Sequence, residues 1–145
     1  MSTQTTWLLK TEPDDYPYHQ LEADKTTAWT GVRNPTAQMH MRAMAKGDEA
    51  FIYHTGNERA IVGLAKVIKT AYEDPDHVGE RTAKGDIKWC LVDVKAIKPA
   101  KTPVTLADIR ADDRFADFVL VKQSRLGVLP VPTAMDKALR KLAGL

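Results

Sequence analysis

The stretch from Trp29 to Asn34 places four recognition chemistries within six residues. Trp29 offers a flat π-face and an indole N–H donor. Gly31 lets the backbone approach a ligand closely, and Arg33 carries a planar fork of donors that matches a phosphate or stacks on a flat group. Asn34 can pair with the edge of a nucleobase. This pattern indicates a site for one phosphate and one planar ring, although Trp29 could instead be a core residue and Arg33 the surface partner of an ion pair.

A helix is predicted to begin directly after this stretch. Asn34 is a favoured N-cap residue, Pro35 suits the first helical position, and residues 36–44 follow a helical pattern that ends before Gly47. The free N–H groups at the start of a helix attract anions. We therefore expect the phosphate to bind at this helix start, beside Arg33.

Two other short segments carry hydrogen-bonding side chains where predicted strands end. Such positions lie at the rim of a sheet, where they can line a pocket, although a rim ion pair between Lys10 and Glu12 or an ordinary barrel mouth would show the same pattern. The candidate residues are Lys10, Thr11, Glu12, Tyr53, His54 and Thr55.

Metal ligands and catalytic groups are sparse in this sequence. The four histidines lie in four separate local contexts, without a second ligand at metal spacing: His19, His40, His54 and His77. Cys90 falls on the apolar face of a predicted strand, where an inert buried thiol is the usual finding. Ser2 and Ser124 are the only serines, and neither lies in a nucleophile motif. We expect no metal, no cofactor and no catalysis.

The length and composition are those of one globular domain. A chain of 145 residues with 43% hydrophobic and 28% charged residues can bury a core without disulfides, so we expect a single domain over residues 1–145. The formal net charge is only +2, so a nucleic-acid partner would require basic residues focused at one place. No apolar run is long enough to span a bilayer, and the polar start is no signal peptide. These features predict a cytoplasmic protein that does not bind membranes, and we expect a monomer.

The predicted elements alternate between strands and short helices. Strands are expected over residues 7–10, 26–29, 49–55, 60–71, 87–98 and 127–131, the last at a sheet edge. Helices are expected over residues 19–23, 36–44, 106–111 and 134–143, with Thr105 and Thr133 as N-caps of the last two. Residues 114–121 read as a helical turn followed by extended chain. The core should include Cys90, Val92, Val94, Met135, Leu139 and Leu142. This order predicts an α+β fold, a small mixed β-barrel of about five or six strands with peripheral helices.

Several separated motifs, taken together, resemble the EVE domain family. They occur in the family's order and spacing along nearly the whole chain, which is far more specific than any single motif. The matching segments are 7–13 (WLLKTEP), 29–34 (WTGVRN), 47–48 (GD), 53–55 (YHT), 61–63 (IVG), 72–75 (YEDP), 88–94, 103–106 (PVTL) and 124–131.

The resemblance implies a PUA-like fold, similar to YTH domains, and binding of modified bases such as methylcytosine in DNA, or binding of RNA, without established catalysis. It implies a nucleobase pocket made of Lys10, Thr11, Glu12, Trp29, Gly31, Val32, Asn34, Tyr53, His54, Thr55 and Leu126. It implies phosphate contacts from Arg33, Ser124 and Arg125. This chain has Thr11 and Thr55 where many members carry serine, and Gly127 where serine often follows the Arg-Leu pair, which changes the size and hydrogen bonding of the pocket.

The mechanism we expect is capture of an extruded base from DNA or RNA. Trp29 would stack on the base, while Asn34, Thr11 or Glu12 reads its Watson–Crick edge. Arg33, Arg125 and Lys10 would hold the flanking phosphates. Two other functions stay open on the same residues. A PUA-like ribonuclease could use Lys10, Tyr53 and His54, and a metabolite-binding module could use the pocket without a polymer.

Overall fold

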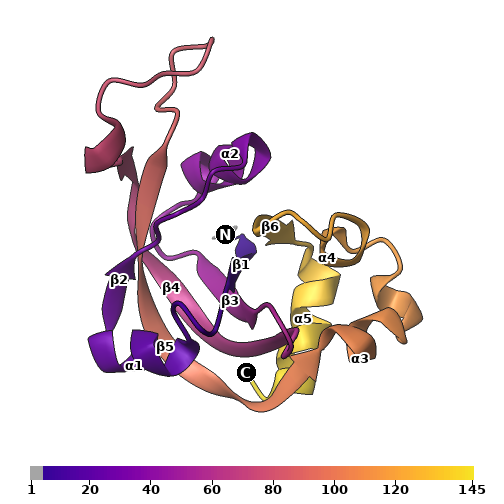
Figure 1. Ribbon diagram of the computed structural model, residues 1–145. Coiled ribbons are helices and arrows are strands. Elements are labelled where there is room, and N and C mark those ends of the chain that lie inside the picture. The colour runs from indigo at the N-terminus through magenta and orange to yellow at the C-terminus, as the bar shows by residue number, and fades with distance from the viewer. Residues whose placement is uncertain (1–4) are drawn as a thin grey trace.

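Six strands form one strongly curved sheet in the computed structural model, which describes residues 5–145 (Figure 1). The strand order is β2-β5-β4-β3-β1-β6. The bounds are β1 Thr6–Thr11, β2 Thr26–Ala28, β3 Glu49–His54, β4 Ala60–Glu73, β5 Cys90–Thr105 and β6 Val128–Val131. β1 runs parallel to β3, and the other neighbouring pairs are antiparallel.

The edges of this sheet stay open. Among residues 5–145, β2 and β6 lie at opposite ends of the strand order and do not pair with each other. The prediction of an α+β fold with six strands is confirmed, and β6 is an edge strand as expected. The prediction of a barrel holds only loosely, because the curved sheet does not close.

Helices lie around both sides of the sheet (Figure 1). They are α1 Tyr18–Asp24, α2 Pro35–Ala43, α3 Leu106–Arg110, α4 Val119–Lys122 and α5 Thr133–Ala143, with 3₁₀ turns η1 Pro75–His77 and η2 Asp113–Phe115. Asn34 caps α2 as predicted, since its side chain accepts a hydrogen bond from the Ala37 N–H. Thr105 caps α3 in a reciprocal capping box with Asp108.

Some predictions about the second half of the chain were wrong. Residues 119–122 form α4 and not extended chain, because Phe118 and Leu120 turn into the core. Pro132 is the N-cap of α5, so Thr133 is its first residue and caps nothing. Leu139 of α5 is buried as predicted, but Leu142, also expected in the core, is 43% exposed. The strand predicted for residues 87–98 begins at Cys90 and continues to Thr105.

The core lies between the curved sheet and the helices. Cys90, Val92 and Val94 are buried as predicted. The Cys90 thiol donates to Gln38 Oε1 at 3.1 Å, and burial raises the pKa of this thiol. It is therefore a structural group with little thiolate character. No helix within residues 5–145 is long and apolar enough to cross a membrane.

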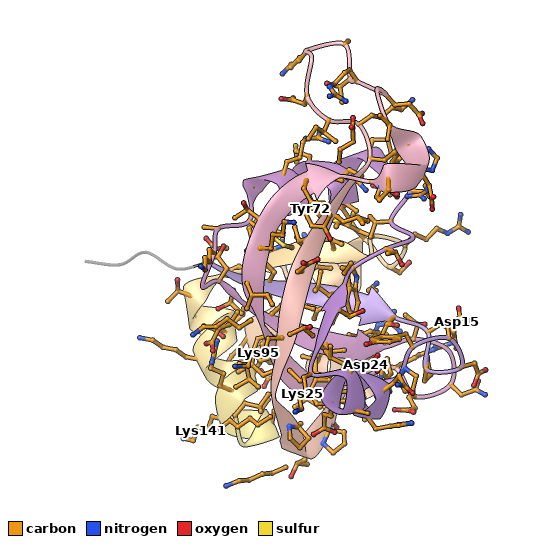
Figure 2. The ribbon with its side chains drawn as sticks, turned by 90° about the vertical axis from the view of Figure 1, so that its left-hand side faces the viewer. Asp15, Asp24, Lys25, Tyr72, Lys95 and Lys141 are labelled. Atoms are coloured by element: carbon orange, nitrogen blue, oxygen red, sulfur yellow. The ribbon has the colours of Figure 1, made fainter. Side chains whose placement is uncertain are left out.

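An arm made of residues 74–89 projects from the ends of β4 and β5, away from the rest of the sheet (Figure 1). It contains η1 and one isolated bridge between Arg81 and Ile87. Figure 2 shows the face of the sheet near β2, β4 and β5, on which Lys25, Tyr72 and Lys95 lie. The arm and this face lie apart from the side of the molecule that carries α3 and α4 in Figure 1.

Candidate nucleic-acid interface

Parallel pairing of β1 with β3 brings two of the predicted segments together. Lys10 lies opposite Tyr53, and Thr11 lies opposite His54. The segments are more than forty positions apart in the sequence, yet the two neighbouring parallel strands finish at the same end of the sheet. This edge is the frame on which the candidate site is built.

Lys10 occupies the centre of the site. Its Nζ donates to the Ser124 carbonyl oxygen at 2.8 Å and lies 5.7 Å from the centroid of the Tyr53 ring. The side chain is half-buried, and burial lowers the pKa of Lys10. Two N–H donors of the ammonium group remain for other partners.

On one side of Lys10 lies a pocket of about 320 Å³, here termed the aromatic pocket. The rings of Tyr16 and Trp29 meet edge to face in it, with centroids 6.4 Å apart and planes at 85°. Trp29 follows β2, and its backbone N–H donates to the Val92 carbonyl oxygen at 2.8 Å. The lining residues are Lys10, Thr11, Asp15, Tyr16, Thr27, Ala28, Trp29 and Thr30.

Trp29 serves the core as well as this pocket. Only 6% of its surface is exposed, so most of the indole face is covered by protein. Tyr16 is the more accessible of the two rings. The prediction that Trp29 alone presents a flat stacking face therefore needs correction: the pocket wall is a Tyr16–Trp29 pair, with Trp29 anchored in the core.

On the other side of Lys10 lies a second pocket of about 300 Å³, here termed the basic pocket. It is lined by Lys10, Tyr53, Thr55, Gly56, Arg59, Leu106, Arg110, Leu120 and Ser124. Burial raises the pKa of the Tyr53 phenol, and the positive charges of Arg59 and Arg110 act against that rise. Both guanidinium groups therefore act electrostatically on this phenol.

A third pocket of about 320 Å³, termed the α2 pocket, lies at the start of α2. Its lining residues are Asn34, Thr36, Lys122, Gln123, Ser124, Arg125 and Leu126. The Asn34 Oδ1 atom is occupied by its capping bond to Ala37 N at 3.0 Å, which leaves the amide NH₂ as the free group. The structure thus joins the predicted helix start to Ser124, Arg125 and Leu126.

Arg33 points elsewhere, toward the arm. Its guanidinium lies 5.3 Å from the Trp89 ring centroid, 3.6 Å from an Asp74 carboxylate oxygen and 3.2 Å from His77 Nε2. It lines none of the three pockets above. The sequence grouped Arg33 with Ser124 and Arg125, but the structure does not bring them together.

His54 and Glu12 are engaged by the fold. His54 is buried, and its Nε2 accepts the Tyr18 backbone N–H at 3.0 Å while Nδ1 lies 2.9 Å from Glu58. A nitrogen that accepts a backbone N–H carries no proton, so Nδ1 is the protonated atom that donates to Glu58. Glu12 accepts from Thr55 Oγ1 at 2.9 Å. These side chains fix the strand ends and do not line the three pockets, apart from Thr55 in the basic pocket.

Gly31 and Val32 shape the loop between the aromatic and α2 pockets. Gly31 has φ of +79°, a conformation that other residues rarely adopt. The Val32 carbonyl oxygen accepts from Gln38 Nε2 at 2.9 Å, which ties the loop to α2. Their contribution to the site is backbone geometry.

The comparisons with known proteins agree with this architecture. The family model of the EVE domain matches residues 5–142. The chain belongs to the EVE domain family. Human thymocyte nuclear protein 1 is 31% identical over 152 residues, an alignment that covers 86% of this chain. The chain spans about two thirds of the curated relatives' length, 68% of the human and 63% of the chicken protein.

Solved structures of similar chains extend this finding. An NMR structure of a Rhodopseudomonas palustris protein is 46% identical, with a TM-score of 0.85 and coverage of 97% of this chain and 93% of that one. The crystal structure of human THYN1 in complex with DNA containing 5-methylcytosine is 28% identical, with a TM-score of 0.86 and coverage of 98% and 99%. An ASCH protein from Zymomonas mobilis, at 11% identity and a TM-score of 0.57, shares the PUA-like fold alone.

Three residues of this EVE domain were missed by the sequence reasoning. Tyr16 follows the first strand in a turn, Arg59 closes the β3–β4 hairpin, and Arg110 lies in the last turn of α3. The Leu106 N–H donates to the Arg59 carbonyl oxygen at 2.7 Å and holds α3 against the hairpin. Arg59 and Arg110 come together through the pairing of β4 with the far end of β5, and Tyr16 lies beside Trp29 through the packing of two segments that are separate in the sequence.

Proposed function

We propose that this EVE domain is a non-catalytic nucleic-acid-binding domain that captures a modified nucleobase in the aromatic pocket. The observation that carries the proposal is the hydrogen bond between Lys10 Nζ and the Ser124 carbonyl oxygen. Lys10 lines both the aromatic and the basic pocket, and Ser124 lines both the basic and the α2 pocket. A site for a flat ring therefore adjoins two sites rich in positive charge, which suits a nucleotide within a strand.

The aromatic pocket offers hydrogen-bonding groups for the edge of a base. Thr11 Oγ1 donates to the Tyr16 carbonyl oxygen at 2.9 Å, so its lone pairs can accept from an amino group of the base. Asp15 adds a carboxylate, and Lys10 supplies N–H donors for a base carbonyl. Cytosine presents an amino donor beside acceptor atoms, which this arrangement can match. Ala28 and Trp29 supply apolar surface against which a methyl group could pack.

A base inside a duplex must leave the stack to reach such a pocket. Extrusion costs a few kcal/mol, and stacking on aromatic side chains contributes roughly 1–3 kcal/mol per base. Contact with the Tyr16–Trp29 pair would offset much of that cost. Human THYN1 was solved in complex with DNA that contains 5-methylcytosine, which supports methylcytosine as the first base to test.

Phosphates would be held chiefly in the α2 pocket. Arg125 brings a positive charge to the start of α2, beside Ser124 and the Asn34 amide group. Lys122 adds a second charge, which is paired with Asp117 at 3.0 Å. The Thr36 N–H at the helix start can also face an anion. Arg33, on the arm side, could contact a more distant phosphate.

A ribonuclease, the alternative function, would need His54 as a free catalytic group. Both ring nitrogens of His54 are occupied, by Tyr18 and Glu58, so the ring is not free to act as a general base. Lys10 and Tyr53 remain as polar groups suited to binding. Turnover of RNA that disappears in a Lys10→Met variant would overturn the non-catalytic proposal.

The decisive experiment measures affinity by fluorescence anisotropy for oligonucleotides, single and double stranded, with one cytosine or one 5-methylcytosine at the same position. In each pair, we expect the oligonucleotide with unmodified cytosine to bind more weakly than the one with 5-methylcytosine. Thr11→Val and Trp29→Phe should reduce that preference with little change in salt dependence, since they release no counterions. Arg125→Ala should weaken both oligonucleotides alike and lower the salt slope by about one.

Lys95→Ala is the matched control for loss of one charge, since Lys95 is exposed on the face shown in Figure 2. If Thr11→Val and Trp29→Phe keep the full preference while remaining folded, the aromatic pocket is not the base site. Repeating the panel with RNA distinguishes the two polymers.

A further inference from the structure

The basic pocket concentrates positive charge that the fold leaves without an acidic partner. Among residues 5–145, no carboxylate forms an ion pair with Lys10, Arg59 or Arg110. Arg59 uses Nε to donate to the Gly56 carbonyl oxygen at 3.2 Å, which leaves its two terminal nitrogens as donors. Three cations therefore line one small pocket without a carboxylate in its wall.

Tyr53 adds a neutral donor to the lining of this pocket. The side chain is only 3% exposed, and its hydroxyl has no hydrogen-bond partner among residues 5–145. Every fully buried side-chain nitrogen or oxygen of these residues has a hydrogen-bond partner. The unpartnered Tyr53 hydroxyl is therefore not fully buried and must open to the space of the pocket. A buried ring with an exposed, unpartnered hydroxyl is aimed at whatever fills the pocket.

The acids nearest to this pocket do not cancel its charge. Glu12 accepts from Thr55 Oγ1 and lies against Gly56, where a Cβ would meet its Oε1 at 2.9 Å. Glu58 accepts a hydrogen bond from the neutral His54 ring, so its charge is not compensated there, and it lines a neighbouring pocket with Arg59 and Arg110. With Glu12 and Glu58 both counted against the three cations, one positive charge remains in surplus.

The backbone of Arg59 is held in a strained conformation. Its φ is +47°, in the left-handed region that residues with a Cβ seldom occupy. The hydrogen bond from Leu106 N to its carbonyl oxygen fixes this conformation against α3. Backbone strain of this kind beside a pocket is typical of functional positions.

We propose that the basic pocket is an anion-binding site for a phosphate group, held by Arg59 and Arg110, with Lys10 and the Tyr53 hydroxyl donating to its oxygens. Guanidinium groups suit this role because their planar donors match phosphate geometry. This site is distinct from the phosphate contacts of the α2 pocket. It stands without the base-capture function, because inorganic phosphate alone can test it.

The test is titration of inorganic phosphate into the full ¹⁵N-labelled chain at constant ionic strength, followed by amide chemical shifts. We expect saturable shifts around Tyr53, Arg59 and α3. The double variant Arg59→Gly/Arg110→Gln should bind phosphate at least about tenfold more weakly, because two charge-assisted contacts are lost. Tyr53→Phe should show a smaller loss.

Arg59→Gly is chosen because glycine accepts the left-handed backbone, so the fold is expected to remain intact. Lys95→Ala, which removes one exposed charge from the face in Figure 2, should bind phosphate as the parent chain does. The proposal is overturned if shifts do not saturate, if they centre elsewhere, or if the double variant, folded by its melting temperature, binds phosphate unchanged.

The source of the phosphate is resolved with oligonucleotides that carry either a 5′-phosphate or a 5′-hydroxyl. A gain from the terminal phosphate that Arg59→Gly/Arg110→Gln abolishes identifies a monoester ligand. Equal affinity, with both strands weakened by the double variant, identifies a backbone phosphodiester. A double variant that binds both strands and inorganic phosphate like the parent chain contradicts the proposal, whatever the fate of the base pocket.

Discussion

The aromatic pocket and the basic pocket share Lys10 but are built from different parts of the structure. The aromatic pocket takes its wall from Trp29, a residue embedded in the core. The basic pocket takes its charge from Arg59 and Arg110, which are exposed side chains on a hairpin and a short helix. In the first, recognition and stability depend on the same atoms. In the second, charge can be removed with little effect on the fold.

The largest effect should therefore come from truncation in the aromatic pocket. Trp29→Ala removes a side chain that is 6% exposed and should lower the free energy of unfolding by about 3–5 kcal/mol. Arg110→Ala removes an exposed side chain outside the core and should change it by no more than about 0.5 kcal/mol. Urea denaturation of the two variants measures both values. Equal losses in the free energy of unfolding would contradict the distinction between the pockets. Trp29→Phe is the variant in which base preference can be measured on a folded chain.

A smaller effect on stability is expected when a backbone position in the lining of the basic pocket, Gly56, is compared with one of its charged residues, Arg59. Gly56 has φ of +73°, and a Cβ there would lie 2.9 Å from Glu12 Oε1. Gly56→Ala should destabilise the chain by about 1–3 kcal/mol and disturb the Glu12–Thr55 contact. Arg59→Gly should be neutral or stabilising by up to about 1 kcal/mol, because relief of about 1–2 kcal/mol of strain exceeds the entropic cost of glycine.

Thermal unfolding, with phosphate titration on the same samples, measures this pair. Gly56→Ala keeps all three cations, so its phosphate affinity should fall less than that of Arg59→Gly despite its lower stability. An Arg59→Gly variant that unfolds more easily than Gly56→Ala would show that Arg59 serves the fold and not the pocket.

Part of the first pocket could be anticipated from the sequence, and the arginines of the second could not. Lys10, Thr11 and Trp29 lie at strand ends within recognisable motifs, and these three line the aromatic pocket, whereas the other residues predicted for the base site do not. The start of α2 was equally predictable, because capping by Asn34 depends on neighbours within a few residues. Interactions between residues close in the sequence can be predicted from the local pattern.

Long-range assembly accounts for what was missed. Arg59 and Arg110 meet only because the far end of β5 pairs with the start of β4, at Thr105 and Ala60. The predicted strand ended at residue 98, which left this pairing out of reach. For His54 a long-range contact had the opposite consequence. Its position at a strand end suggested a pocket residue, but its Nε2 atom accepts a hydrogen bond from the Tyr18 backbone N–H.

The smallest expected effect concerns Lys10, the residue that both pockets share. Burial lowers the pKa of Lys10 below its ordinary value of 10.5, so the unfolded chain holds this proton more tightly than the folded one. Stability should therefore rise slightly with pH as the folded lysine loses its proton, up to the ordinary value. Bound phosphate favours the charged form, so phosphate affinity should fall over the same interval. Isothermal titration calorimetry from about pH 8.5, where inorganic phosphate is already mainly a dianion, to about pH 10 measures this fall.

The other groups facing Lys10 do not share this pH dependence. Arg59 and Arg110 contribute guanidinium groups, which proteins do not deprotonate. Burial raises the pKa of the Tyr53 phenol above its ordinary value. Lys10→Met should bind phosphate more weakly at neutral pH and flatten the fall, whereas Tyr53→Phe should leave its midpoint in place. If the fall persists unchanged in Lys10→Met, Lys10 does not contact the anion, and the basic pocket acts through its two arginines alone.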